Sequence, residues 1–278
     1  MPSSVAPFSW HDVGRFQLDP FGIALLVAAG VLYAWGVSRT TGWPRWRTLY
    51  FALGLVVTFL ATESVIGVYD RTYFSDHMIQ HLLLIMVAAP LFALATPLDL
   101  SYAAGTTRLR RVLDGRFVTF LTQPLLAFAI YFVFIPVAHL TNLYNEMLLH
   151  DWIHDAEHLA FLVVGYLFFR VAFGLERGRT IHPGLRLVYV MAAVPVDTFT
   201  GLALAMSSHN PFSAYQRLAP VGSTSSSILD NVHLGGAYMW IGGDALMLAA
   251  CVPIAVAWVR WETLRTAELD AQLDAEGR

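Results

Sequence analysis

The chain alternates between long apolar blocks and short polar stretches. A transmembrane α-helix needs about 20 consecutive apolar residues, whereas a soluble helix carries a narrower apolar stripe at the helical period. Seven blocks reach membrane-spanning length, at residues 20–37, 48–67, 77–98, 118–138, 156–174, 185–207 and 234–259. The pattern therefore predicts an all-α polytopic membrane protein, a helix bundle with about seven transmembrane helices.

Composition agrees with a chain embedded in a lipid bilayer. Of its 278 residues, 56% are hydrophobic and 13% are charged, whereas soluble domains average about 25% charged residues. No internal repeat or long linker divides the blocks, so we expect residues 1–278 to form a single transmembrane domain. It would have a short outer segment at 1–19, unlike a signal peptide, and a charged tail at 261–278 that forms a short surface helix. The net charge is −3, and we expect no nucleic-acid partner.

All 17 basic residues are arginine, and their placement predicts the orientation of the helices. Cytoplasmic loops of membrane proteins carry an excess of basic residues. Alternate connections and the tail hold fourteen arginines: Arg39, Arg45, Arg47, Arg108, Arg110, Arg111, Arg116, Arg170, Arg177, Arg179, Arg186, Arg260, Arg265 and Arg278. The other connections hold Arg15, Arg71 and Arg217. We therefore expect the N-terminus outside and the C-terminus in the cytoplasm.

With this orientation, eight of the ten histidines lie at the outer ends of helices. His77 and His81 are four residues apart, as are His154 and His158, so each pair shares one helix face. Two imidazoles one turn apart can hold one metal ion. We expect these two pairs to form a metal site, with a weaker surrounding shell of His150, His209 and His233. The remaining histidines, His11, His139 and His182, are interpreted as polar groups at the membrane interface.

Sulfur and carboxylate side chains narrow the chemistry. The thioethers of Met78, Met206 and Met239 fall near the histidines, and imidazole with thioether favours copper over zinc, calcium or magnesium. The single cysteine, Cys251, provides no thiolate pair. The acids Glu63, Asp197 and Asp244 lie within apolar blocks, where a charge is costly. They are candidates for extra ligands or a proton path, or else for hydrogen-bonded structural groups.

No catalytic pattern accompanies the histidines. The residues between His77 and His81 are Met, Ile and Gln, so the glutamate of a metalloprotease motif is missing. We expect that the chain is not an enzyme.

Three segments resemble one known family. The first runs from His77-Met78-Ile79-Gln80-His81 to Pro90, the second is His154 to His158, and the third is Asp230 to Trp240. Together they resemble the CtaG family of caa-type cytochrome c oxidase assembly factors. The family usually has Asp-Gln-Gln-Leu-Gly-Gly in the third segment, where this chain has Asn231 and His233.

The resemblance implies a seven-helix, multi-pass protein of the bacterial plasma membrane that helps to mature a haem-copper oxidase. Its role would be that of a copper chaperone, which binds copper at the extracytoplasmic face and delivers it to an oxidase subunit. Its partners would be oxidase subunits and the lipid bilayer, with homo-oligomer formation left open. Two alternatives remain, a copper or proton-coupled transporter and a haem-binding membrane redox protein.

Overall fold

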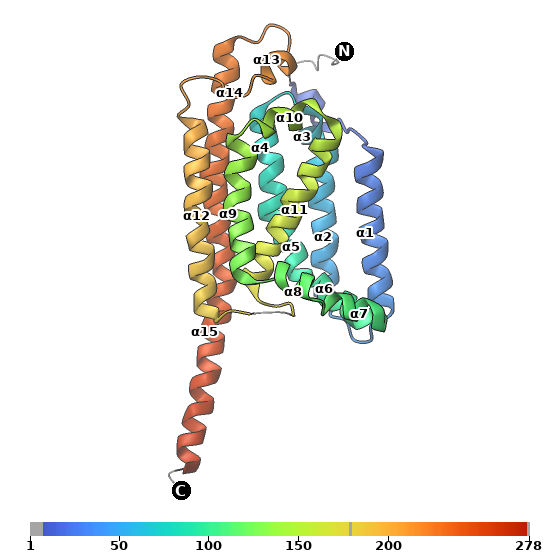
Figure 1. Ribbon diagram of the computed structural model, residues 1–278, viewed down its shortest axis with the longest axis vertical. Coiled ribbons are helices and arrows are strands. Elements are labelled where there is room, and N and C mark those ends of the chain that lie inside the picture. The colour runs from blue at the N-terminus through green and yellow to red at the C-terminus, as the bar shows by residue number, and fades with distance from the viewer. Residues whose placement is uncertain (1–7, 178–179, 277–278) are drawn as a thin grey trace.

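The computed structural model describes residues 8–177 and 180–276, which form a bundle of helices without any β-strand (Figure 1). The helices of the bundle are α1 (Pro20–Ser38), α2 (Arg45–Glu63), α4 (Phe74–Leu82), α5 (Ala89–Ala95), α9 (Pro124–Leu140), α11 (Asp151–Phe173), α12 (Pro183–Ala205), α14 (Ser225–Ala237) and α15 (Gly243–Glu276). The short connecting helices are α3 (Val65–Tyr69), α6 (Pro97–Ala104), α7 (Thr107–Leu113), α8 (Arg116–Leu121), α10 (Leu143–Leu149), α13 (Tyr215–Leu218) and the 3-10 turn η1 (Trp10–Gly14). Two π-helical segments, η2 (Leu83–Ala88) and η3 (Tyr238–Gly242), join α4 to α5 and α14 to α15.

Within the described residues, six helical stretches are long and apolar enough to cross a membrane: Pro20–Ser38, Arg45–Tyr69, Phe74–Ala104, Asp151–Phe173, Pro183–Ala205 and Ser225–Ala275. A seventh is present if Thr107–Leu121 and Pro124–Leu140, which meet at an angle of 55°, are counted as one span. The prediction of an all-α polytopic membrane bundle is therefore confirmed.

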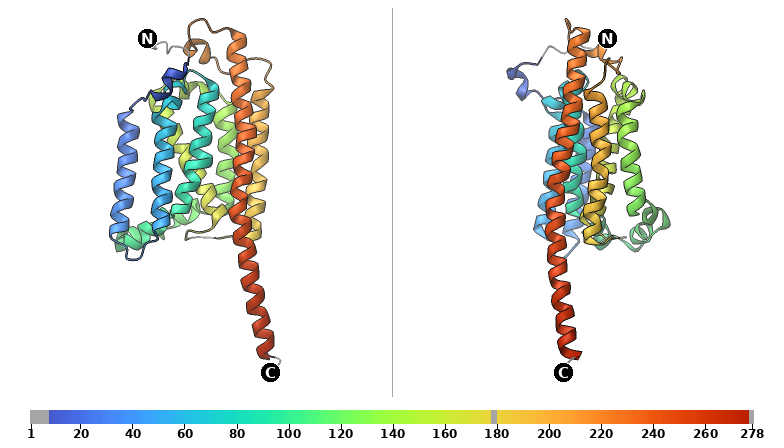
Figure 2. Two further views of the ribbon diagram at one scale, coloured as in Figure 1. Left: turned by 180° about the vertical axis from the view of Figure 1, so that it is seen from behind. Right: turned by 90° about the vertical axis from the view of Figure 1, so that its left-hand side faces the viewer.

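Two boundaries differ from the sequence-based prediction. The fourth span is regular only from Pro124, which begins α9 after the bend that follows α8. The seventh begins at Ser225, because the Thr224 hydroxyl accepts a hydrogen bond from Ser227 N and caps the helix. The tail is not a separate surface helix: α15 runs on without a break and extends past the rest of the bundle (Figure 2).

The helices divide the molecule into two ends of different character. The arginine-rich helices α7 and α8 lie at one end with α6, and α3, α10 and α13 lie at the other (Figure 1). Arg179 and Arg278 lie outside the described residues. Helix α1 lies at the edge of the bundle, where it packs against α2 and α6.

Close packing positions α11 beside the chain that carries the first histidine pair. Helix α11 contacts both η2 and α5. At Gly165 an added Cβ would lie 2.7 Å from the Cβ of Ala89 and 2.8 Å from the carbonyl oxygen of Ile85. Pro90 has no backbone N–H to donate in the preceding turn, and the wider π-turn of η2 accommodates it. Glycine and the π-turn together let α11 approach η2 and α5 closely, next to the end of α4 that carries His81.

Candidate metal centre

Two groups of possible metal ligands lie side by side where α4 and α11 begin. The buried group consists of His77, His81 and Glu157, and in it one potential ligand atom from each residue lies within 4.8 Å of the others. The second group consists of Asp70, His154 and His158 and satisfies the same distance criterion. We call it the cavity group, since both of its histidines line a cavity. Asp70 comes from the turn between α3 and α4, and the remaining residues come from α4 and α11.

Glu157 is the centre of the buried group. Its Oε1 atom lies 3.0 Å from His81 Nε2 and 3.4 Å from His77 Nε2. These side chains are almost completely shielded from solvent. His81 Nε2 has no hydrogen-bond partner, because its short contact with Glu157 Oε1 lacks hydrogen-bond geometry. Glu157 Oε2 has no hydrogen-bond partner either.

A chain of hydrogen bonds assigns the tautomer of His81. His139 Nδ1 lies 2.8 Å from the carbonyl oxygen of Ile135, so this nitrogen must carry a proton. In a neutral His139, Nε2 is therefore an acceptor, and His81 Nδ1 donates to it at 3.1 Å. His81 Nε2 is then a lone pair directed at the Glu157 carboxylate.

His77 has an oxygen acceptor at each of its two ring nitrogens. Its Nδ1 atom lies 3.3 Å from the carbonyl oxygen of Asp70 and donates to it. Its Nε2 atom makes a hydrogen bond of 3.4 Å to Glu157 Oε1, and since a carboxylate accepts, this nitrogen carries a proton when no metal is bound. The carboxylate thus meets one protonated nitrogen, from His77, and one lone pair, from His81, and a metal ion could replace the His77 proton and bridge all three side chains. Histidines that bind metals commonly donate their other ring N–H to a carbonyl or a neighbouring side chain, as both do here.

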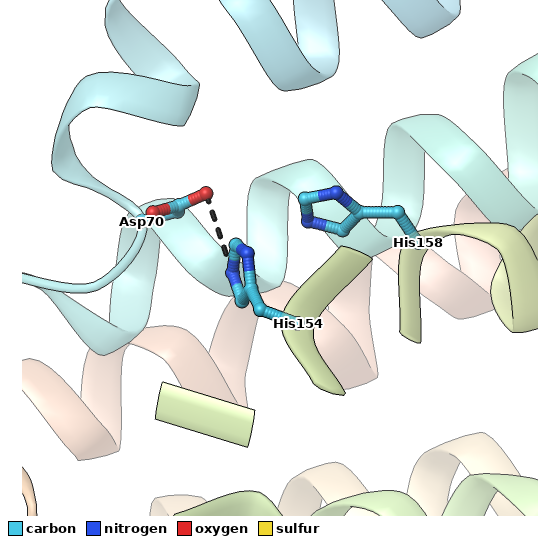
Figure 3. A group of neighbouring side chains, drawn as sticks. All are labelled: Asp70, His154 and His158. Carbon is cyan, nitrogen blue, oxygen red and sulfur yellow. Dashed lines mark ion pairs between the residues drawn. The ribbon is translucent and has the colours of Figure 1, made fainter. Parts of the chain in front are cut away.

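The cavity group has a different set of hydrogen bonds. Asp70 Oδ2 lies 3.5 Å from His154 Nε2, which has no hydrogen-bond partner (Figure 3). The Gln80 amide donates to Asp70 Oδ2 at 2.8 Å and to the carbonyl oxygen of Ala61 at 3.0 Å, which fixes its orientation. Gln80 Oε1 consequently accepts from His158 Nε2 at 2.9 Å. Burial raises the pKa of Asp70 to about 6.

The structure brings the four predicted histidines together but divides them between the two groups. The rings of His77 and His154 lie 5.5 Å apart between centroids, so the groups are neighbours. The sequence analysis missed the carboxylates Asp70 and Glu157. The available signal for Glu157 was its position one residue before His158, on the histidine-bearing face of α11.

The expected outer shell lies outside both groups. His150 is half exposed beside Glu146, His209 bonds to the neighbouring Ser208, and His233 donates to the carbonyl oxygen of Ser207. His139 corrects our interpretation of it as an interfacial group, because it is buried and contacts His81.

The three methionines are also absent from the two groups. Met206 is 74% exposed, whereas Met78 and Met239 are packed in the hydrophobic core. The donors that the structure assembles are therefore imidazole and carboxylate, and the thioether reason for preferring copper does not apply to either group.

Each acid predicted within the membrane has a hydrogen-bond donor. Asp197 accepts from the Tyr131 hydroxyl at 2.7 Å, and the Thr198 hydroxyl lies 3.0 Å from both Asp244 oxygens. Glu63 lies at the end of α2 and accepts from the backbone N–H of Asp19 at 2.8 Å. These contacts fit the structural alternative for the acids, and none of the three belongs to either ligand group.

A cavity of about 510 Å³ lies between α1, α2 and α11. His154 and His158 form part of its wall, so the cavity group can be reached from it. Carboxylates dominate the charged lining, which comprises Asp19, Glu63, Asp151, Asp155 and Arg71. The buried group does not line this cavity.

Comparison with known proteins identifies the class to which this fold and these residues belong. Residues 31–261 match the family described as cytochrome c oxidase caa3 assembly factor, and the chain belongs to this family. An uncharacterized protein of Mycobacterium bovis is 28% identical over 274 residues, which are 91% of this chain and 41% of that protein. An uncharacterized protein of Mycobacterium leprae is 24% identical over 273 residues, 93% of this chain and 41% of that protein.

The chain thus spans about two fifths of the length of the curated relatives it matches. No solved structure matches it.

Proposed function

We propose that this chain is a copper carrier for the assembly of a haem-copper oxidase and that the buried group holds the copper. The observation that carries the proposal is the convergence of two imidazole Nε2 atoms on the Glu157 carboxylate, within a family of oxidase assembly factors. The chain would act by binding and release, without catalysing a reaction.

The donor set supports a transition metal. Imidazole suits copper, zinc, iron and nickel, whereas magnesium and calcium prefer oxygen ligands alone. We propose copper from this series because the family assembles an oxidase that the proposal takes to be copper-dependent. Neither group includes a thiolate, and a site without thiolates holds copper less tightly, which suits a protein that must give up its cargo.

The proposed place of delivery is the outer face of the bacterial plasma membrane. The buried group lies in the first turns of α4 and α11, and the arginine-rich helices α7 and α8 lie at the opposite end of the bundle (Figure 1). By the positive-inside rule, the arginine-rich end faces the cytoplasm. Oxidase subunits in the same membrane would then receive the copper at the outer face.

Removal of both α4 histidines tests the proposal. The double variant His77→Ala/His81→Ala should insert normally, lose the copper of the purified protein and leave the host oxidase deficient in copper. His209→Ala, which alters an exposed histidine outside both groups, is the matched control. Full copper content and a normal oxidase in the double variant would overturn the proposal. An absorption spectrum of the same preparations tests the haem alternative.

A further inference from the structure

The cavity between α1, α2 and α11 has the charge expected of a place where cations gather. Four carboxylates and one guanidinium face it, and the Arg71 guanidinium forms an ion pair with Asp151. Asp155 lies one residue after His154 and lines the same cavity. An acid-lined cleft with apolar walls raises the local concentration of cations and their rate of association.

One ligand atom of the cavity group, His154 Nε2, has no hydrogen bond to give up when an ion binds. His154 is 3% exposed, and its Nε2 atom has no hydrogen-bond partner, although it faces Asp70 Oδ2 at 3.5 Å. The His154 residue lines the acidic cavity, and its unpartnered nitrogen is buried behind that surface, facing Asp70. It offers a first ligand to a cation that passes inward from the cavity.

The other two ligand residues of the cavity group, Asp70 and His158, are both hydrogen-bonded to Gln80. Its amide donates to Asp70 Oδ2, and its carbonyl oxygen accepts the His158 Nε2 proton. A metal ion bound at these atoms must displace both hydrogen bonds and the proton on His158. In the buried group, an ion must displace only the hydrogen bond between His77 and Glu157 at 3.4 Å, since His81 Nε2 and Glu157 Oε2 have none. An ion is therefore held more weakly in the cavity group than in the buried group.

We propose that the cavity group is a second, weaker copper site, which receives the ion from the acidic cavity and passes it to the buried group. Gln80 acts as a positioning residue: when no ion is bound, its hydrogen bonds occupy the ligand atoms of Asp70 and His158. The transfer distance is short, because the rings of His77 and His154 lie 5.5 Å apart. The inference rests on the proposed function, since it assumes that the buried group holds copper.

The test compares the wild type with variants in two quantities, the number of copper ions bound and the rate of binding. Full-length protein in detergent is mixed with Cu²⁺; the bound ions are counted by electron paramagnetic resonance and the filling rate is followed by stopped-flow tryptophan quenching. The wild type should bind two ions. His154→Ala should bind one ion, and the copper affinity of the buried group should be nearly unchanged. Copper should enter the buried group at least about tenfold more slowly, the scale on which charged clefts alter association rates. His209→Ala should behave like the wild type.

Two further variants keep the inference falsifiable if His154→Ala does not fold. Asp155→Asn removes a cavity charge without removing a ligand, so it should slow filling by about threefold, and high salt should abolish the difference. Gln80→Leu frees Asp70 and His158, so it should strengthen copper binding in the weaker site. A wild-type rate of copper binding in Asp155→Asn at low salt overturns the loading path, whether or not His154→Ala folds.

The proposed function fails separately from this inference. If His77→Ala/His81→Ala retains the tighter ion, the buried group is not the cargo site, and both proposals fall. If that variant loses the tighter ion while the wild type binds a single copper, the buried group stands and the second site falls.

Discussion

His81 donates its Nδ1 proton to Nε2 of His139, 3.1 Å away, where α4 passes the end of α9. Since His139 donates its own Nδ1 proton to the carbonyl oxygen of Ile135, this contact leaves the other nitrogen of His81 free for a metal. His139 is thus a positioning residue for the buried group, although it contributes no atom to that group.

Two replacements of His139 separate this role from simple packing. His139→Gln keeps an acceptor for the His81 proton, whereas His139→Leu fills similar space without one. We expect the leucine variant to lose about 10- to 100-fold in copper affinity, the usual cost of removing a hydrogen-bond partner of a ligand, and the glutamine variant to lose much less. Competition titration with a copper chelator measures both, and equal affinities would refute the positioning role.

Glu157→Gln should have opposite effects on metal binding and on stability. The glutamine amide can donate to His81 Nε2, which has no hydrogen-bond partner in the wild type, while its carbonyl oxygen accepts from His77 Nε2 in place of the carboxylate. An unsatisfied buried polar group costs about 1–3 kcal/mol, so the metal-free variant should unfold at a higher temperature than the wild type. Its copper binding should be lost because the charged ligand is gone.

Thermal unfolding of metal-free protein in detergent, followed by copper titration, checks both parts. Glu146→Gln is the control, because this half-exposed glutamate lies outside the two groups. A Glu157→Gln variant that is destabilised when free of metal would show that the Glu157 carboxylate is bridged by a proton to His81 as well as to His77.

The sequence predicted the membrane-spanning helices and the paired histidines, but not the carboxylates that lie beside them. Apolar blocks of spanning length and the four-residue spacing of the histidines depend on local periodicity, which the chain displays directly. Asp70 enters the site only because the turn after α3 folds it back over α4, where it accepts from Gln80. Such a contact depends on tertiary packing, and no local pattern records it.

The loop after α11 should make stability depend on pH. Glu176 accepts hydrogen bonds from Tyr166 and from the backbone of Leu98, and its carboxylate lies 3.3 Å from Arg170 Nε. Burial nevertheless raises its pKa to about 7 from an ordinary value of 4.5. The folded chain therefore binds a proton more tightly than the unfolded chain does. The resulting stability is complete below about pH 4.5 and is lost as pH rises through about 7.

This linkage is worth on the order of 1–3 kcal/mol, at about 1.4 kcal/mol per pKa unit. Unfolding midpoints of detergent-solubilised protein should fall between about pH 5 and pH 8, and Glu176→Gln should flatten that decline. The difference between the two curves isolates Glu176 from groups that both proteins share. Parallel curves would show that its titration does not contribute.

The orientation of the bundle can be tested with reporters. A fusion after Arg265, in the part of α15 beyond the bundle, should be cytoplasmic, and an insertion at Gly222, in the loop before α14, should be external. The reason is the concentration of arginine at the end of the molecule that carries α7 and α8. The reverse pattern would place both ligand groups on the cytoplasmic side and exclude delivery at the outer face.

Because η2 is a π-helical segment, the chain after His81 can lose a residue without disturbing the histidine pair, whereas the chain before His81 cannot. A single deletion within Leu83–Ala88 removes the extra residue of the wide turn, so the segment can revert to α-helix while His77 and His81 keep their spacing. A single deletion within Met78–Gln80 instead rotates one imidazole about 100° away from the other. Natural variants with single-residue deletions are therefore expected in the first segment and not in the second.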